Sequence, residues 1–212
     1  MFARINRVVW VMVITDFFVN SAFGSFAPVF AIFITGQITG GNAKVAGFAA
    51  SVYWITKSLV QLPIARFLDH SKSEKRHFWA MFLGYLFSAL TPFMYLFVAE
   101  PWQLYVVQGF MGFCMAWAVP AWYSIFTRHV DTWRVGFEWS LESVFSVGAA
   151  TALATALGGF IADRFGFDVL FAAAGTLAVL SSLFLLAMRR DLFPHPPEGI
   201  EQVLPERHLR RH

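Results

Sequence analysis

The feature that most constrains this chain is a series of six long apolar stretches that contain almost no charged side chains. The stretches cover about residues 8–33, 45–68, 78–98, 102–127, 138–162 and 167–188. A helix needs about 20 predominantly apolar residues to cross a bilayer, and each stretch reaches that length. Because backbone polar groups in lipid must be hydrogen-bonded within the protein, we predict an all-α integral membrane protein with six transmembrane helices.

Composition agrees with a membrane protein and excludes several other classes. Charged residues make up 14% of the 212-residue chain and hydrophobic residues 58%, whereas a soluble domain is about one quarter charged. A water-soluble globule, a disordered chain and a coiled coil all need more polar residues than this. Cys114 is the sole cysteine, which excludes an intrachain disulfide and a cysteine-based metal site. The length suits six spans of about 20 residues but not twelve.

The basic residues are divided unequally between the two ends of the predicted helices. Thirteen of them fall on one side: Arg4, Arg7, Arg66, Lys72, Lys75, Arg76, Arg128, Arg134, Arg189, Arg190, Arg207, Arg210 and Arg211. Only Lys44 and Arg164 fall on the other side. Cytoplasmic connections carry the excess of Lys and Arg, so we expect a multi-pass cell (inner) membrane protein with both termini cytoplasmic. Residues 1–190 then form the transmembrane domain, and residues 191–212 form an extended or disordered cytoplasmic tail.

Three ionisable residues lie inside the predicted spans, where a charge is costly and marks a candidate functional site. They are Asp16, Lys57 and Glu142. At a rise of 1.5 Å per residue, Asp16 lies about 12 Å and Lys57 about 15 Å from an end of its span. Because the two depths are similar, we expect an ion pair between Asp16 and Lys57. That pair either takes part in the function or is purely structural.

Polar and aromatic side chains recur at helical spacing in the first, second, fourth and fifth spans, so that in each span they lie along one face. They are Asn20 in the first span, Tyr53, Trp54 and Gln61 in the second, Tyr105, Gln108, Trp117 and Tyr123 in the fourth, and Glu138 and Ser146 in the fifth. Such groups suit a small organic ligand, although the same Tyr and Trp residues also serve as packing or interface anchors. The third and sixth spans carry no charged residue in their interiors, so we expect them to face lipid.

Two connections and two helices carry features similar to those of a known family. Residues 65–76, with Asp69 followed by Lys72, Lys75 and Arg76, look like a degenerate cytoplasmic motif in which Ala65 replaces the leading Gly. Residues 158–167 are similar to the junction between the fifth and sixth helices of that family. Gln108-Gly109 matches the tail of its fourth-helix motif, although Tyr105 stands where an Arg is expected. Asp16, upstream of Pro28, is similar to a first-helix acid of many drug and metabolite carriers.

In this order, the motifs resemble one half of the major facilitator superfamily over about residues 8–190. The resemblance implies six helices arranged as two inverted three-helix repeats, which is half of a twelve-helix carrier. Two parallel copies of such a half would reproduce the complete carrier. We therefore expect a parallel homodimer that carries a small organic solute by alternating access through a cavity at its axis.

The resemblance also implies roles for particular residues. It places the first and fourth helices around the cavity and the second and fifth between the halves. Asp69, Arg134 and Glu138 would form a charge lock that breaks as the carrier changes state, and Asp163 and Arg164 belong to the matching junction on the other side. Asp16 and Glu142 are the expected proton carriers, since burial disfavours the charged form of a carboxyl group. A proton gradient, used in symport or antiport, would then drive transport without any cofactor or metal.

Other functions were weighed on the same residues. An intramembrane enzyme needs a nucleophile with a base, or ligands for a metal, at membrane depth. His70, His77 and His129 instead lie at the cytoplasmic edges of the spans, so we do not expect an enzyme. The remaining alternatives are one subunit of a heteromeric carrier and a membrane interaction protein that does not transport. Nothing in the sequence identifies the substrate, and no nucleic-acid partner is expected.

Overall fold

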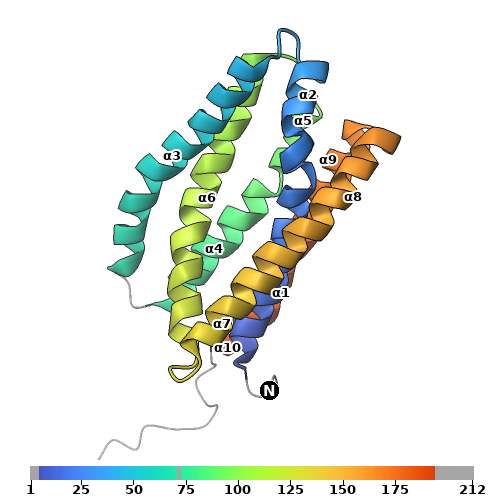
Figure 1. Ribbon diagram of the computed structural model, residues 1–212. Helices are drawn as coiled ribbons and strands as arrows, with labels where there is room; N and C mark the ends of the chain where they lie inside the picture. Colours follow the sequence, from blue (N-terminus) through green and yellow to red (C-terminus); the bar gives the residue numbers. More distant parts are fainter. Residues whose placement is uncertain (1–4, 71–72, 194–212) are drawn as a thin grey trace, which may run out of the picture.

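The computed structural model describes residues 5–70 and 73–193, and every regular element among them is a helix (Figure 1). The prediction of an all-helical chain is therefore confirmed. The predicted tail begins at residue 191, and its residues 194–212 lie outside the described residues. The first two residues of the predicted tail are helical rather than extended, because they belong to α10 (Arg189–Leu192). One of them, Asp191, also contacts α1, since its Oδ1 lies 3.3 Å from Arg7 Nη1.

The first three predicted spans correspond to the following elements. They are α1 (Arg7–Phe26), η1 (Ala27–Val29) and α2 (Phe30–Gln37), then α3 (Ala43–Asp69), then α4 (Glu74–Ser88) and α5 (Thr91–Tyr95). The turn η1 is a 3-10 helix that contains Pro28, and it separates α1 from α2 at the bend expected from that proline. The first span is therefore two helical pieces joined at Pro28.

The last three spans follow in the same way. They are α6 (Pro101–His129), then α7 (Val135–Leu141), η2 (Glu142–Ala149) and α8 (Ala150–Phe165), then α9 (Phe167–Phe184), η3 (Leu185–Met188) and α10. Unlike its α-helical neighbours, η2 is a π-helix, a wider turn that occurs mostly in short segments and frequently at functional sites. Between α8 and α9, Gly166 adopts a φ of 85°, a left-handed conformation that favours glycine.

Five of these helical units are long and apolar enough to cross a membrane: Arg7–Gln37, Glu74–Tyr95, Pro101–His129, Val135–Phe165 and Phe167–Leu192. The sixth, α3, is 27 residues long but does not meet this measure. It carries Lys44, Lys57, Arg66 and Asp69. The chain is thus a multi-pass membrane protein in which the second helix carries charged residues along its length.

The helices pack in two groups of three. In one group α6 lies between α3 and α4, and in the other α1 lies against both α8 and α9 (Figure 1). One group contains the second, third and fourth spans, and the other contains the first, fifth and sixth. The groups therefore do not divide the chain into its first and last three spans, and the inverted repeats stay a prediction. The two groups meet where α1 contacts α6 and α4 contacts α9.

Glycines allow the closest approaches within each group. A Cβ on Gly112 of α6 would lie 2.6 Å from Tyr53 O in α3, and one on Gly84 of α4 would lie 2.8 Å from Cys114 O in α6. A Cβ on Gly158 of α8 would overlap the backbone of Ser25 in α1. Small residues at such points are the usual means of bringing membrane helices into backbone contact. Gly158 therefore fixes the distance between α8 and α1.

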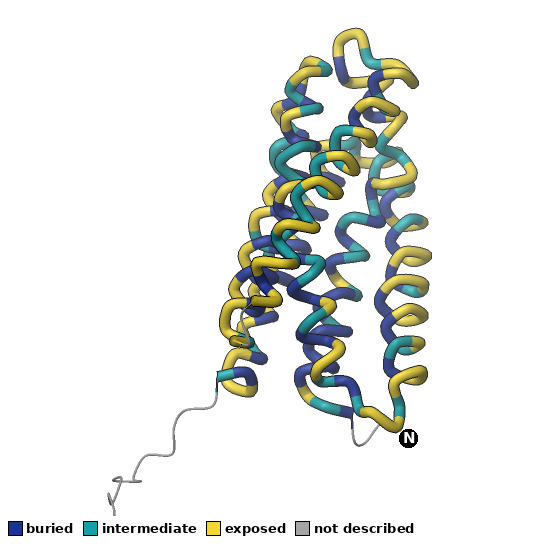
Figure 2. Tube along the Cα trace, turned by 90° about the vertical axis from the view of Figure 1, so that its left-hand side faces the viewer, coloured by how far each residue is buried: buried dark blue, intermediate teal, exposed yellow. Residues whose placement is uncertain are grey.

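The outer surface is apolar, and exposed positions recur along the whole length of the helices (Figure 2). The largest exposed apolar side chains include Leu59 and Leu62 of α3, the latter 72% exposed, and Leu157 and Phe160 of α8. Apolar side chains facing outward are expected for a protein whose solvent is lipid. The faces of α3 and α8 contribute strongly to this surface.

The expectation that the third and sixth spans simply face lipid is wrong for one face of each. Leu83 of α4 and Leu180 of α9 are exposed, but Tyr85 of α4 is buried against α1. From α9, the buried Ser181 Oγ donates a hydrogen bond of 2.8 Å to Thr15 O in α1. Both helices thus present polar groups to the interior, which a count of charged residues does not detect.

Candidate functional site

A cavity of about 450 Å³ lies among α1, α3, α4, α6, α7 and η2. Its lining combines carboxyl, hydroxyl, amide and aromatic groups, together with several apolar side chains. The polar and aromatic members are Asp16, Asn20, Phe23, Tyr53, Tyr85, Trp122, Tyr123, Trp139, Glu142 and Ser143. A concave site with a few convergent polar groups among aromatic walls is typical of a small-molecule site.

Two carboxyl groups meet at this cavity. Asp16 of α1 is 7% exposed and Glu142 of η2 is 5% exposed. The phenol of Tyr85 donates a hydrogen bond of 3.2 Å to Asp16 Oδ1. The Asp16 and Glu142 side chains also interact with each other electrostatically. Two segments that are distant in sequence, α1 and η2, thus supply the buried acidic pair, and α4 supplies the phenol that donates to it.

Ser146 joins this pair to the backbone of α1. Its fully buried Oγ lies 2.6 Å from Glu142 Oε2 and 2.9 Å from Val13 O. In the π-helical turn, Ser146 is four residues after Glu142, and both side chains are buried. The contact between η2 and α1 therefore includes a hydroxyl that touches a carboxyl group and a carbonyl at once.

The expected ion pair between Asp16 and Lys57 is wrong. Lys57 Nζ lies 4.9 Å from the ring centroid of Trp54 and 5.8 Å from that of Tyr53, both on its own helix. Lys57 does not line the cavity, and its ammonium group contacts these two rings rather than Asp16. Similar depth did not bring the two charges together, because α3 packs on α6 rather than on α1.

Of the other predicted ligand-binding residues, Asn20, Tyr53 and Tyr123 line the cavity beside the carboxyl pair. The remaining ones, which are Trp54, Gln61, Tyr105, Gln108 and Trp117, do not. Trp54 is exposed on the outer side of α3, and Tyr105 packs against an apolar cluster around Tyr95. Periodicity along each helix located the correct face of α1, but it extended the site too far along α3 and α6.

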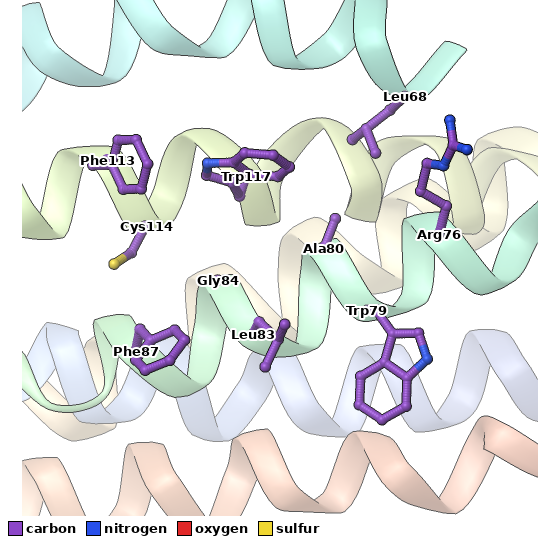
Figure 3. Close-up of a pocket in the computed structure, with 10 residues that line it drawn as sticks. All are labelled: Leu68, Arg76, Trp79, Ala80, Leu83, Gly84, Phe87, Phe113, Cys114 and Trp117. Carbon is purple, nitrogen blue, oxygen red and sulfur yellow. The ribbon is translucent and has the colours of Figure 1, made fainter. Parts of the chain in front are cut away.

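Trp117 lines a separate apolar groove of about 410 Å³ that is formed mainly by α4 and α6, with Leu68 contributed by α3 (Figure 3). Phe113 and Cys114 lie on the same stretch of α6, and Trp79, Leu83 and Phe87 project from α4 (Figure 3). Arg76 is the charged member of the lining. This groove shares no lining residue with the cavity that contains the carboxyl pair.

The sequence reasoning missed an aromatic wall and a phenol. Trp139 of α7 packs against Trp122 and Phe126 of α6, at centroid distances of 5.9 and 4.8 Å. Trp139 lies between Glu138 and Glu142 in the sequence. The four-residue spacing of the two glutamates indicated this segment, but it did not indicate Trp139 itself. Tyr85 is a hydroxyl-bearing side chain in an otherwise apolar part of α4, and that isolation was the available signal for it.

The residues of the predicted charge lock occupy both ends of the molecule. Asp69 is exposed at the end of α3. Glu138 is fully buried, accepts a hydrogen bond of 3.3 Å from Asp131 N, and interacts electrostatically with Arg134. Asp163 and Arg164 are exposed at the opposite end of the unit formed by α7, η2 and α8. Within one chain these residues therefore lie in separate places and do not form a single lock.

The comparison with known protein families decides the relationship. The family model described as Major Facilitator Superfamily matches residues 9–211. The chain belongs to the major facilitator superfamily. The resemblance inferred from the 65–76 and 158–167 motifs is thereby confirmed, and transport across a membrane is the activity typical of this superfamily, whose members are not usually enzymes.

Two relatives illustrate the relationship within the superfamily. A major facilitator superfamily domain-containing protein 6-like of Danio rerio is 32% identical over 124 residues, which are 57% of this chain and 21% of that protein. An uncharacterized MFS-type transporter of Methanocaldococcus jannaschii is 23% identical over 194 residues, which are 89% of this chain and 47% of that protein. The chain thus spans about a fifth and about half of the lengths of these two relatives.

Proposed function

We propose that this chain is half of a secondary transporter that moves a small organic solute by alternating access, coupled to protons through Asp16 and Glu142. The observation that carries the proposal is the acidic pair, buried at membrane depth and facing a cavity of about 450 Å³. Ionisable residues inside membrane segments are rare and usually serve ion or substrate pathways. A carboxyl pair beside a ligand-sized cavity supports such a role better than a structural one.

The contact between the two carboxyl groups supports the proton as the coupling ion. A carboxylate only accepts hydrogen bonds, so two carboxyl groups can bond to each other only if one of them is protonated. Asp16 and Glu142 interact electrostatically at the cavity, so a proton on either carboxyl group relieves the repulsion between two like charges. The phenol of Tyr85 donates to Asp16 Oδ1, where it stabilises negative charge when the proton leaves. The pair is therefore built to hold a proton and to release it.

We propose that the second half of the carrier is another copy of the chain, placed in parallel with both termini cytoplasmic. Support comes from the apolar faces of α3 and α8, which stay exposed when the six helices have packed. These are the helices that the family layout places between halves. Paired across a twofold axis, they would enclose the cavity from the open side. A half-subunit of a heteromeric carrier is the second candidate, supported by the same faces.

At the cytoplasmic end, Asp69 of one copy would lie near the start of α7 in the other. A carboxylate is stabilised at a helix N-terminus, and Arg134 stands at the N-cap of α7. We expect Asp69→Asn to reduce transport while leaving expression and assembly unchanged, since Asp69 is exposed within one chain. Uptake equal to that of the unmodified protein would show that this lock does not exist.

The proposal is tested in two steps. A thermal-shift screen of the purified protein against sugars, amino acids, organic anions and organic cations identifies a ligand, because a ligand that binds the folded state raises the melting temperature. Accumulation of that ligand is then measured in liposomes with an imposed pH difference. We expect Asp16→Asn to abolish accumulation but to retain exchange of ligand at equal concentrations. Accumulation by Asp16→Asn would exclude Asp16 as the proton carrier.

A measurement of mass distinguishes the two assemblies. A homodimer in nanodiscs, with uptake by that dimer, supports the symmetric carrier. A monomer that becomes active only with a different six-helix chain supports the heteromer, and a monomer or dimer without uptake of any screened ligand supports an interaction protein.

A further inference from the structure

The hydroxyl group of Ser146 has one hydrogen to donate but two acceptor oxygens beside it. Its Oγ is within hydrogen-bonding distance of both Glu142 Oε2, at 2.6 Å, and Val13 O, at 2.9 Å. A serine hydroxyl donates a single hydrogen bond, and a carbonyl oxygen only accepts. A single hydrogen cannot make two full hydrogen bonds, so both contacts reach full strength only when Glu142 carries a proton on Oε2 and donates it to Ser146, which then donates to Val13.

We propose that Ser146 is a positioning residue that converts the protonation of Glu142 into a contact between η2 and α1. This inference deepens the proton coupling proposed above and rests on it. With Glu142 protonated, the chain of bonds runs from Glu142 through Ser146 to the Val13 carbonyl and ties the two helices together. When the proton leaves Oε2 for water in the cavity, the Ser146 hydrogen turns to the carboxylate, and the bond to Val13 is lost.

The groups around Glu142 explain why the bond between Ser146 and Val13 would respond to pH. The groups around the cavity that can ionise are Asp16 of α1, Tyr85 of α4, Tyr53 of α3 and Tyr123 of α6. Tyr85 and Asp16 form one side of the network, and Asp16 touches Glu142. No other ionisable side chain among the described residues lines the cavity, so the proton exchanged there belongs to the Asp16–Glu142 pair.

Two other hydroxyl groups hold α1 to neighbouring helices without contacting a carboxyl group. Ser181 Oγ of α9 donates to Thr15 O at 2.8 Å, and Thr155 Oγ1 of α8 donates to Gly24 O at 3.4 Å. These bonds do not depend on protonation, so α1 stays held at both positions while the contact at Val13 opens. The change is thus confined to η2, where the π-helical turn already departs from regular helix.

Hydrogen–deuterium exchange of residues 142–149 in nanodiscs, over a pH series corrected for the intrinsic exchange rate, tests the inference. Loss of one hydrogen bond should make exchange about two- to tenfold faster. We expect this increase on alkalinisation of the unmodified protein. Glu142→Gln should stay slow at every pH because its amide still donates to Ser146, and Ser146→Ala should be fast at every pH.

Two further variants make the result decisive. Glu142→Gln/Ser146→Ala should exchange as fast as Ser146→Ala, because the amide then has no hydroxyl through which to act. Ser181→Ala is the matched control, since it removes a bond between helices without a carboxyl group, and it should keep the pH dependence in residues 142–149. A pH dependence that persists in Ser146→Ala, or a double variant that stays slow, would overturn the role of Ser146.

Exchange needs no substrate, so the two proposals fail separately. A pH-dependent contact in a protein that does not accumulate solute under a pH difference would leave Ser146 in place and remove proton-coupled transport. Proton-coupled accumulation by a protein whose residues 142–149 exchange equally at all pH values would support proton-coupled transport and remove the role of Ser146.

The groove in Figure 3 carries a second, independent inference. It is open to the outer surface, is lined by aromatic and aliphatic side chains, and has Arg76 as its charged member. Arg76 lies in the first turn of α4, at the helix end where Arg66 and Lys75 also lie. Basic sites between membrane helices at the cytoplasmic side bind anionic lipid head groups.

We propose that the groove seats one acyl chain of an anionic phospholipid whose head group binds Arg76. In nanodiscs that contain equal amounts of phosphatidylglycerol and phosphatidylcholine, native mass spectrometry should show retained phosphatidylglycerol. Arg76→Gln should reduce that retention severalfold, and Leu83→Trp, which fills the groove, should reduce it too. Arg128→Gln, an exposed basic residue near the same end that does not line the groove, should not. Equal retention by all variants would overturn the proposal.

Discussion

Gly158 and Gly159 are adjacent in α8, yet the structure predicts opposite effects for the same substitution. A Cβ on Gly158 would lie 2.8 Å from Ser25 Cα and would overlap the Ser25 carbonyl, whereas a Cβ on Gly159 meets no atom within 4 Å. The neighbours of Gly158 are backbone atoms, which cannot turn aside as a side chain can. Gly158→Ala therefore requires α8 and α1 to move apart.

The size of the effect follows from this geometry. Inserting atoms into a packed site costs about 1–3 kcal/mol, and 1 kcal/mol changes the melting temperature of a chain of this length by about 2–4 °C. Gly158→Ala should thus lower the melting temperature by about 2–12 °C, near the upper end because the obstacle is backbone. Gly159→Ala should leave it unchanged or raise it by about 2–4 °C, since Ala is the better helix former by about 1 kcal/mol.

Fluorescence-detected thermal unfolding of the two variants in the same detergent measures both numbers. The difference in melting temperature between them matters more than either value, because detergent effects cancel between neighbouring positions. Equal melting temperatures for Gly158→Ala and Gly159→Ala would refute the packing of α8 against α1. The carboxyl pair depends on that packing, because Asp16 lies in α1 and Glu142 lies in the turn that precedes α8.

Three further predictions concern the cavity. Lys57→Met should keep proton-driven accumulation, measured in liposomes, because Lys57 contacts Tyr53 and Trp54 rather than Asp16. Loss of accumulation in this variant would instead support an ion pair between Lys57 and Asp16. Trp139→Leu should weaken binding of the identified ligand, measured by titration, by about tenfold as an aromatic wall is removed, with an unchanged melting temperature of the empty protein as the control. Tyr85→Phe should alter the pH dependence of accumulation without abolishing it, and an unchanged profile would exclude a role for the phenol.

Much of the fold was predictable because the bilayer limits the choices. Apolar runs of the required length located the helices, and Pro28 lies at the break between α1 and α2. These features depend on local chemistry, so a single sequence contains them. The π-helical form of η2 was not predictable, since its apolar sequence fits a regular helix equally well.

The two carboxyl groups at the cavity were predictable from the sequence, but their contacts were not. Asp16 and Glu142 were identified because a buried charge is costly wherever it lies. Their partnership was missed because helical spacing gives depth and face but not which helix is the neighbour. Since α3 packs on α6 and η2 packs on α1, the acid of one span meets the acid of another, and Lys57 stays against its own aromatic neighbours.

Proton movement that accompanies solute movement tests the central claim most directly. Liposomes that contain the protein and an internal pH-sensitive dye are given a gradient of the ligand identified by thermal shift, with no pH difference imposed. We predict that the solute gradient changes the internal pH in the unmodified protein and does not do so in Asp16→Asn, although both exchange the solute. Solute movement by the unmodified protein with no change of internal pH would contradict proton coupling through the Asp16–Glu142 pair.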